Sequence, residues 1–296
     1  MKIFLSVLSD PLSASSLESI QRLMGYLKRS GIHCDLADEP CWLIDPKIRA
    51  DQWNHALRSG EYDWIFDISG GNLANLCAPY LDYSAYKASK CIFAGFSDLS
   101  CLINAVSFKT QRPTLLYALY YQRNLNTILE LLHIHKDLIG LTNQSKERDI
   151  PKTSCRSNPL HSRLSVSIHI PEEKSGFSMD EFNTGKSLGG NIRCFLKLAG
   201  TDSFPDLTDH TLVLEGMGTS KYEFLSLMEQ LNMMKAFEQA SQVLFGCFSK
   251  IMQETGREGY EDFLLWAMDY LEIDIPWAWT DQVGHVEDGK PILLEA

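Results

Sequence analysis

One serine stands where a strand-like apolar run meets a helix-like segment, a place where a hydroxyl could act as a nucleophile. Gly95-Phe96-Ser97-Asp98 overlaps the end of the apolar run 91–96. A serine on such a turn can be held exposed, as in the nucleophile elbow of hydrolases, while backbone N–H groups at the helix start point at a developing oxyanion. The alternative is a plain helix N-cap, a common role of serine at this position. Ser97 is therefore a candidate nucleophile with a structural alternative.

A carboxylate and an imidazole could complete such a site. Glu215 closes the apolar segment 211–214, and His285 follows Gly284 after an aromatic stretch. In open α/β sheets ligands bind beyond the carboxyl ends of strands, where a carboxylate can orient a histidine. The unperturbed pKa of histidine lies near neutrality, which suits a general base. The alternatives are a solvated strand-end charge and a surface-loop histidine.

Two other features are ambiguous by themselves. Gly70-Gly71 follows an apolar run and could be a tight turn or a place where backbone comes close to a ligand. His133 and His135 are two residues apart, so they do not share a helix face and do not predict a metal pair.

Strand and helix patterns alternate around these residues. This alternation predicts an α/β fold with a mainly parallel sheet flanked by helices. We expect strands at 2–8, 33–37, 62–69, 91–96, 164–170, 211–215 and 243–249. Further short apolar runs stand at 114–121, 275–279 and 291–294. We expect helices at 13–29, 47–59, 73–81, 97–109, 123–138, 191–199, 220–233 and 260–271.

The chain length and one change of composition predict two domains. At 296 residues the chain is about two average domains long. Residues 141–188 contain several Ser and Pro and little periodicity, which is typical of a connection. We therefore expect an N-terminal α/β domain over 1–140, a linker over 141–186 and a mixed-sheet α/β domain over 187–296.

Composition excludes several classes of protein. Lys and Arg total 27 against 38 Asp and Glu, a net charge of −11, which argues against binding a nucleic acid polymer or an anionic membrane. The start of the chain resembles a strand more than a signal peptide, and no apolar run is long enough to span a membrane. The eight cysteines are scattered without a Cys-x-x-Cys pair, so we expect no zinc site and a reducing, cytoplasmic location.

In their order along the chain these motifs resemble the LD-carboxypeptidase family of serine peptidases, which also contains the microcin C immunity peptidases. The resemblance covers roughly 14–120 and 185–296. The residues that carry it are Ser69-Gly70-Gly71, Ala78–Tyr83, Ile92–Ser100, Leu188–Asn191, Leu198–Thr201, Leu212–Glu215 and Val283–His285.

The resemblance implies a Ser-His-Glu triad. In that family the matching residues make Ser97 the nucleophile, His285 the base and Glu215 its carboxylate partner. The backbone N–H groups of Gly71 and Asp98 would hold the oxyanion. The implied substrate is a small peptide or murein fragment that loses a terminal D-amino acid. We expect no metal or organic cofactor. The family also suggests a homodimer. Because the nucleophile and its partners come from different halves, we expect the site to lie between domains.

This sequence also departs from the family pattern. The usual Arg-Gly-Gly-Tyr-Gly reads Ser69-Gly70-Gly71-Asn72-Leu73, so an Arg and an aromatic are missing from the loop. The usual Gly-Pro after the next strand is absent, and the usual Ala-Pro-Ser reads Ser9-Asp10-Pro11. These departures point to amide hydrolysis more strongly than to one murein specificity.

Two alternatives to a murein carboxypeptidase remain open. One is an immunity-type amidase acting on peptidyl or aminoacyl nucleotides, for which Trp277 and Trp279 could stack on a base. The other is a non-catalytic peptide-binding relative.

Overall fold

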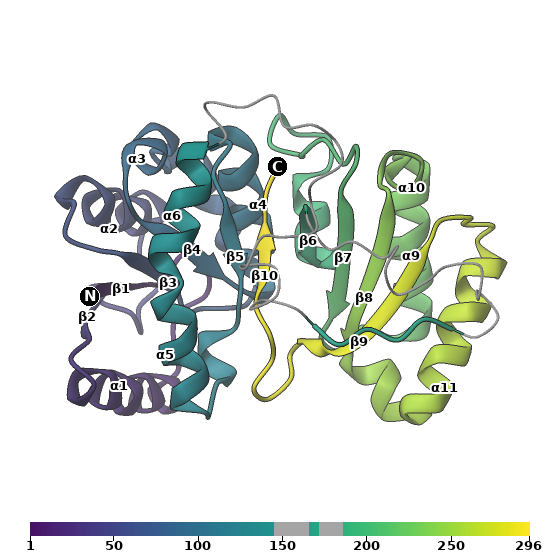
Figure 1. The fold of residues 1–296 in the computed structure, drawn as a ribbon, viewed down its shortest axis with the longest axis horizontal. Coiled ribbons are helices and arrows are strands. Elements are labelled where there is room, and N and C mark those ends of the chain that lie inside the picture. Colours follow the sequence, from purple (N-terminus) through teal and green to yellow (C-terminus); the bar gives the residue numbers. More distant parts are fainter. Residues whose placement is uncertain (145–165, 172–185) are drawn as a thin grey trace.

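The computed structural model describes residues 1–144, 166–171 and 186–296, and its strands form one ten-stranded sheet flanked by helices (Figure 1). The strand order is β2-β1-β3-β4-β5-β10-β6-β7-β8-β9. The expected α/β class with a mostly parallel sheet is therefore confirmed.

The first half of the chain supplies the left part of the sheet in Figure 1. Its strands are β1 (Lys2–Ser6), β2 (His33–Leu36), β3 (Trp64–Asp67), β4 (Ile92–Gly95) and β5 (Thr114–Leu116), all paired in parallel. Its α-helices are α1 (Ala14–Arg29), α2 (Pro46–Ser59), α3 (Tyr83–Ala88), α4 (Ser100–Thr110), α5 (Leu125–His133) and α6 (His135–Gln144). Short 3-10 helices are η1 (Ala74–Leu76), η2 (Ala78–Tyr80), η3 (Ser97–Leu99) and η4 (Leu119–Tyr121).

The second half supplies the right part. Its strands β6 (Ser187–Asn191), β7 (Thr211–Gly216), β8 (Gln242–Phe248) and β9 (Trp277–Gly284) also pair in parallel. The helices are α8 (Ile192–Phe195), α9 (Lys221–Met233), α10 (Ala236–Gln239) and α11 (Ser249–Tyr270), with the 3-10 helix η7 (Leu196–Leu198) after α8.

The C-terminal strand β10 (Ile292–Leu294) joins the two halves. It pairs antiparallel with β5 and parallel with β6, so the strand direction reverses at this junction. The last strand of the chain is thus inserted at the centre of the sheet, between segments that are far apart in sequence (Figure 1).

Two clusters of buried side chains form the core. One draws mainly on residues 3–138 and 292–294, and the other on residues 188–279. One sheet therefore carries two cores, each with its own helices. Of the expected linker over 141–186, only 141–144, 166–171 and 186 lie within the described residues.

Helix α4 lies between the halves and is buried along nearly its whole length. Its polar side chains Ser100, Asn104 and Ser107 fall on one face, at i, i+4 and i+7. Asn104 donates to the Gly189 carbonyl at 2.7 Å and accepts from the Gly189 amide at 2.8 Å. Ser107 Oγ donates to the Leu294 carbonyl at 3.3 Å. These bonds fix the second half against the helix that begins just after Ser97.

Most predicted elements are present, and several of them differ in extent or type. The helix expected at 73–81 is instead the two short helices η1 and η2, because Pro79 lacks the N–H that a continuous α-helix needs. The helix expected at 260–271 begins at Ser249 and includes Gly256 with a non-helical φ of 72°. Of the strand expected at 164–170, residues 164 and 165 lie outside the described residues, and His169 forms a single antiparallel bridge with Trp279.

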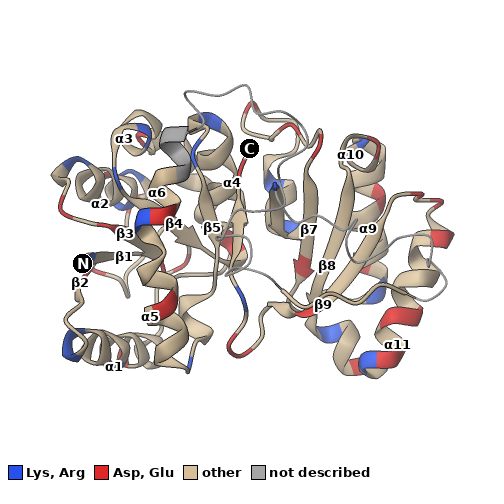
Figure 2. Ribbon diagram, in the orientation of Figure 1, with Lys and Arg blue, Asp and Glu red and all other residues tan. Residues whose placement is uncertain are grey.

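Among the described residues, no helix combines the length and the apolar character needed to cross a membrane. Charged side chains of both signs are interspersed along helices such as α11 in the view of Figure 2.

Candidate active site

The candidate nucleophile sits on a sharp turn. Ser97 follows β4 and opens η3 with a φ of 57°, in the left-handed region that side-chain-bearing residues rarely adopt. Phe96 occupies the N-cap position of η3, and no side-chain cap hydrogen bond is made there. The geometry is therefore that of a strained strand-to-helix turn and differs from a simple serine cap.

Glu215 and His285 are in direct contact. His285 Nδ1 lies 3.1 Å from Glu215 Oε2, and the two side chains are 5% and 0% exposed. An ionised carboxylate can only accept, so this contact requires a proton on Nδ1, and in a neutral ring Nε2 is then free to accept a hydrogen bond. Glu215 Oε1 is buried with no hydrogen-bond partner among the described residues.

The sheet is irregular where Glu215 lies. The register of β7 on β8 shifts between Leu214 and Gly216, and that of β8 on β9 shifts between Phe245 and Cys247. Such irregularities re-aim side chains and often lie near functional sites. His285 follows β9 directly, so the ends of two non-adjacent strands supply the pair.

The imidazole packs against the turn that carries the serine. The ring centroids of Phe96 and His285 are 4.8 Å apart, and those of Tyr121 and His285 are 5.7 Å apart. Because Phe96 directly precedes Ser97, the histidine lies beside the nucleophile turn. No hydrogen bond joins Ser97 Oγ to His285 among the described contacts.

The Gly70-Gly71 loop lies next to Ser97. A Cβ built on Gly70 would come within 3.8 Å of Ser97 Oγ. Gly71 has a φ of 123°, and a Cβ there would overlap the Asp10 carboxylate, so this position requires glycine. Asp10 fixes the loop: its amide donates to the Gly70 carbonyl at 3.2 Å, and its Oδ1 accepts from the Asn72 amide at 3.0 Å.

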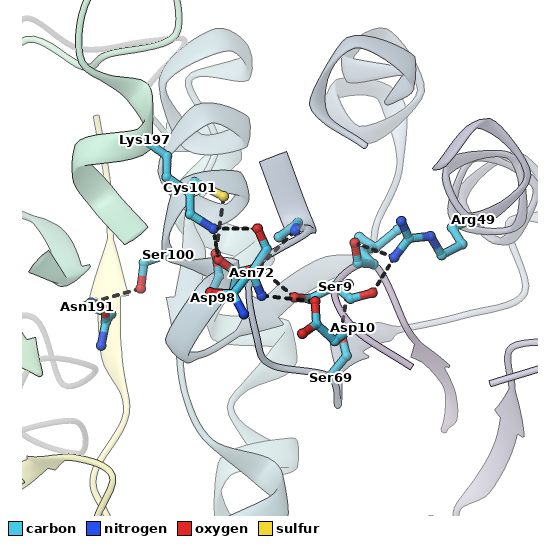
Figure 3. Close-up of polar contacts among 12 residues, drawn as sticks. Ser9, Asp10, Arg49, Ser69, Asn72, Asp98, Ser100, Cys101, Asn191 and Lys197 are labelled. Carbon is cyan, nitrogen blue, oxygen red and sulfur yellow. Dashed lines mark hydrogen bonds and ion pairs between the residues drawn. The ribbon is translucent and has the colours of Figure 1, made fainter. Parts of the chain in front are cut away.

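Asp98 is fully buried just after Ser97. Its Oδ2 accepts from Ser9 Oγ at 2.6 Å and from the Ala74 amide at 2.8 Å, and its Oδ1 pairs with Lys197 (Figure 3). Burial opposes ionisation of this carboxyl, but the ion pair and these hydrogen bonds outweigh it and hold the pKa of Asp98 below its ordinary value. The side chain therefore anchors the start of η3.

Sequence reasoning missed Lys197, Ser9 and Asp10. Lys197 is the one charged residue in the run Phe195–Ala199, and its neighbours Leu196 and Leu198 are buried. A lone lysine in an apolar run is a signal that could have been noticed. Nothing in the sequence around Ser9 and Asp10 shows that their partners lie about 60 to 90 residues away.

Trp277 and Trp279 do not present an open stacking surface. Each is 3% exposed, and both belong to the second core. Trp279 Nε1 donates to Glu261 at 2.6 Å, and Trp277 packs on Phe245. The prediction that they stack on a base therefore finds no support in their burial. Within the described part of the chain, no group of three or more His, Cys, Asp or Glu side chains is placed to hold a metal ion.

Comparison with known families gives two matches. The model of the LD-carboxypeptidase N-terminal domain matches residues 3–117, and that of the LD-carboxypeptidase C-terminal domain matches residues 184–296.

Curated relatives agree with this match. A Vibrio cholerae protein named as a putative carboxypeptidase is 24% identical over 217 residues, covering 67% of this chain and 62% of the relative. The microcin C7 self-immunity protein MccF of Escherichia coli is 23% identical over 215 residues, covering 68% and 60%. The chain thus matches less than two thirds of the length of each.

Solved structures share the fold. An MccF-like protein from Bacillus anthracis superposes with a TM-score of 0.71 at 19% identity, covering 99% of this chain and 91% of that one. A muramoyltetrapeptide carboxypeptidase from Oxalobacter formigenes superposes with a TM-score of 0.66 at 16% identity, covering 100% and 93%.

Proposed function

This chain belongs to the LD-carboxypeptidase family, and from that membership we propose that it is a serine hydrolase that cleaves an amide bond with Ser97, His285 and Glu215. The observation that carries the proposal is the hydrogen-bonded Glu215–His285 pair packed against the strained turn that holds Ser97. Two halves of one sheet supply these groups, and the family predicts them in this order along the chain.

The chemistry assigns one step to each side chain. His285 Nε2 takes the proton of Ser97 Oγ as the oxygen attacks the substrate carbonyl, and the same nitrogen then protonates the leaving amine. Glu215 holds the Nδ1 proton, which fixes the tautomer and stabilises the imidazolium that forms. A water molecule then attacks the acyl-enzyme while His285 Nε2 takes its proton. The same nitrogen returns the proton to Ser97 Oγ as the acid product leaves.

The developing oxyanion requires donors beside Ser97. In this proposal they are the backbone N–H groups of Gly71 and Asp98. Support comes from the approach of the Gly70-Gly71 loop to Ser97 Oγ and from the position of Asp98 at the start of η3. Removing one such donor typically costs about 10²–10³ in kcat.

The substrate proposed first is a murein-type peptide that loses a terminal D-amino acid. The family description and the muramoyltetrapeptide carboxypeptidase of similar fold support it. The protein should release D-alanine from a murein tetrapeptide, and Ser97→Ala should not. Absence of release by the wild-type protein, or equal release by the variant, contradicts this substrate.

A second candidate is amide cleavage in a peptidyl or aminoacyl nucleotide. MccF structures of similar fold, with a TM-score of 0.68, were solved in complex with aspartyl sulfamoyl adenosine and glutamyl sulfamoyl guanosine. A panel of peptidyl-adenylate analogues assayed beside the tetrapeptide separates the two substrates.

A fluorophosphonate probe tests the nucleophile independently of the substrate. Labelling of the wild-type protein but not of Ser97→Ala would support the triad and exclude the non-catalytic alternative. An unlabelled wild-type protein would contradict the proposed function.

A further inference from the structure

Lys197 touches both backbone segments that the proposed function uses as oxyanion donors. Its Nζ pairs with Asp98 Oδ1 and donates to the Asn72 carbonyl at 2.8 Å (Figure 3). Asp98 is one proposed donor residue, and Asn72 directly follows the other, Gly71. Two segments from different turns of the first half are thus joined by one ammonium group from the second half.

We infer that Lys197 is a positioning residue: it keeps the backbone N–H groups of Gly71 and Asp98 at the positions from which both can donate to the oxyanion. This inference rests on the proposed function. An ammonium group has three donors, so it can hold a carboxylate and a carbonyl at once. Preorganised donors stabilise a transition state because they need not reorganise during the reaction.

The positive charge of Lys197 compensates the negative charge of the buried Asp98 carboxylate. Cys101 and Cys194 also lie near this carboxylate, and Cys101 Sγ donates to the Asp98 carbonyl at 3.1 Å. Burial raises the pKa of the Cys101 thiol and raises that of Cys194 to about 12, so both thiols are neutral near pH 7. Among the described residues, Lys197 forms the ion pair with Asp98.

The backbone around Lys197 fixes where its side chain can reach. Leu196 and Leu198, on either side, are 7% and 4% exposed, and they anchor η7 in the two cores. Upstream, a Cβ on Gly190 would lie 2.5 Å from Ser100 Oγ, so the chain leading to η7 packs directly on α4. The Lys197 side chain is 21% exposed, whereas the Asp98 side chain that it pairs with is fully buried.

Hydrogen bonds within the first half also connect the segments that carry Ser9, Ser69 and Asp98. Ser9 Oγ donates to Asp98, the Ser9 amide donates to Ser69 Oγ at 2.9 Å, and Ser69 Oγ donates to Asp67 at 2.5 Å. Arg49 donates to the Leu8 and Ser9 carbonyls. These contacts hold the loops within the first half, and Lys197 adds the tie to the second half. Catalytic geometry thereby depends on how the halves are docked.

The test compares Lys197→Met with Lys197→Arg. With a fluorophosphonate probe, Lys197→Met should react with Ser97 about 10- to 100-fold more slowly than the wild-type protein, a fraction of the effect of losing a donor outright. With an activated ester, kcat should fall while KM changes less than about threefold, because the loss falls on the transition state. Lys197→Arg keeps the charge and the donors, and it should recover most of the rate.

Lys109→Met is the matched control. Lys109 also joins the two halves, through Asp202 at 3.2 Å, but Asp202 is exposed and neither residue contacts the loops around Ser97. This variant should label at the wild-type rate. A slowdown equal to that of Lys197→Met would show that any loss of an ion pair between the halves has the effect, and it would overturn the assignment.

The double variant Lys197→Met/Asp98→Asn covers the case in which Lys197→Met fails to fold because a buried carboxylate loses its cation. The amide oxygen introduced by the second substitution can still accept from Ser9 and Ala74, so no buried charge remains. The double variant should melt at a higher temperature than Lys197→Met and still label at least 10-fold more slowly than the wild-type protein. A wild-type rate in this variant overturns the inference, whereas an unlabelled wild-type protein overturns the proposed function instead.

Discussion

Glu215 Oε2 and His285 Nδ1 lie 3.1 Å apart although 70 residues separate them in the chain. Glu215 is the next-to-last residue of β7, and His285 directly follows β9, with β8 between these strands in the sheet. Both side chains are buried, so water competes little for their hydrogen bond. The geometry of the pair is therefore held by the fold itself.

Replacing Glu215 by Gln should abolish most activity without unfolding the protein. Gln keeps the shape but removes the negative charge that selects the Nδ1 proton and stabilises the imidazolium. By analogy with other triads the expected loss in kcat is about 10³–10⁴. Ester hydrolysis and thermal melting measure the two effects. A variant that retains more than a tenth of the wild-type kcat would argue against this role.

Replacing Ser97 by Gly should stabilise the protein while removing the proposed nucleophile. Ser97 has a φ of 57°, and strain of this kind costs about 1–3 kcal/mol, of which glycine relieves part. We expect a gain of about 1 kcal/mol in the free energy of unfolding, measured by urea denaturation. Ser97→Ala, which keeps the strain, is the control and should show no such gain.

The Asp98 carboxyl should stabilise the fold at neutral pH and lose this effect in acid. Its pKa is held below the ordinary value, so the folded protein binds fewer protons than the unfolded chain near that value. The stabilisation is therefore complete above the ordinary pKa of about 4 and declines as pH falls toward the folded pKa. The difference in unfolding free energy between the wild-type protein and Asp98→Asn, measured from pH 7 to pH 3, should shrink. A constant difference would contradict the assignment.

Removing the Asn104 side chain should weaken the attachment of the two halves. Asn104→Ala leaves the buried amide and carbonyl of Gly189 without these partners. Each buried unsatisfied group costs about 1–3 kcal/mol, so we expect a loss of about 2–4 kcal/mol in urea denaturation. Asn232→Ala, at an exposed amide paired only with Glu229 in the contacts described, should change stability by less than about 0.5 kcal/mol.

Much of the fold follows from local patterns. The alternation of strands and helices predicts the α/β class because the hydrophobic period of each segment is a local property. Local rules explain less well where elements end. The segment 73–81 has helical spacing, yet Pro79 divides it into η1 and η2. The spacing of Ser100, Asn104 and Ser107 on one face of α4 can be read from the sequence. Only the structure shows that this face hydrogen-bonds to the second half of the chain.

The family motifs, and with them Ser97, Glu215 and His285, can be identified from residue order alone. The folded structure is needed to see that Glu215 touches His285, that Phe96 packs on the imidazole and that Lys197 reaches Asp98. These contacts join segments about 70 to 190 residues apart. Contacts of this kind form when two clusters of buried side chains pack on one sheet and bring distant segments together. Local helix or strand propensities do not specify which distant residues then meet.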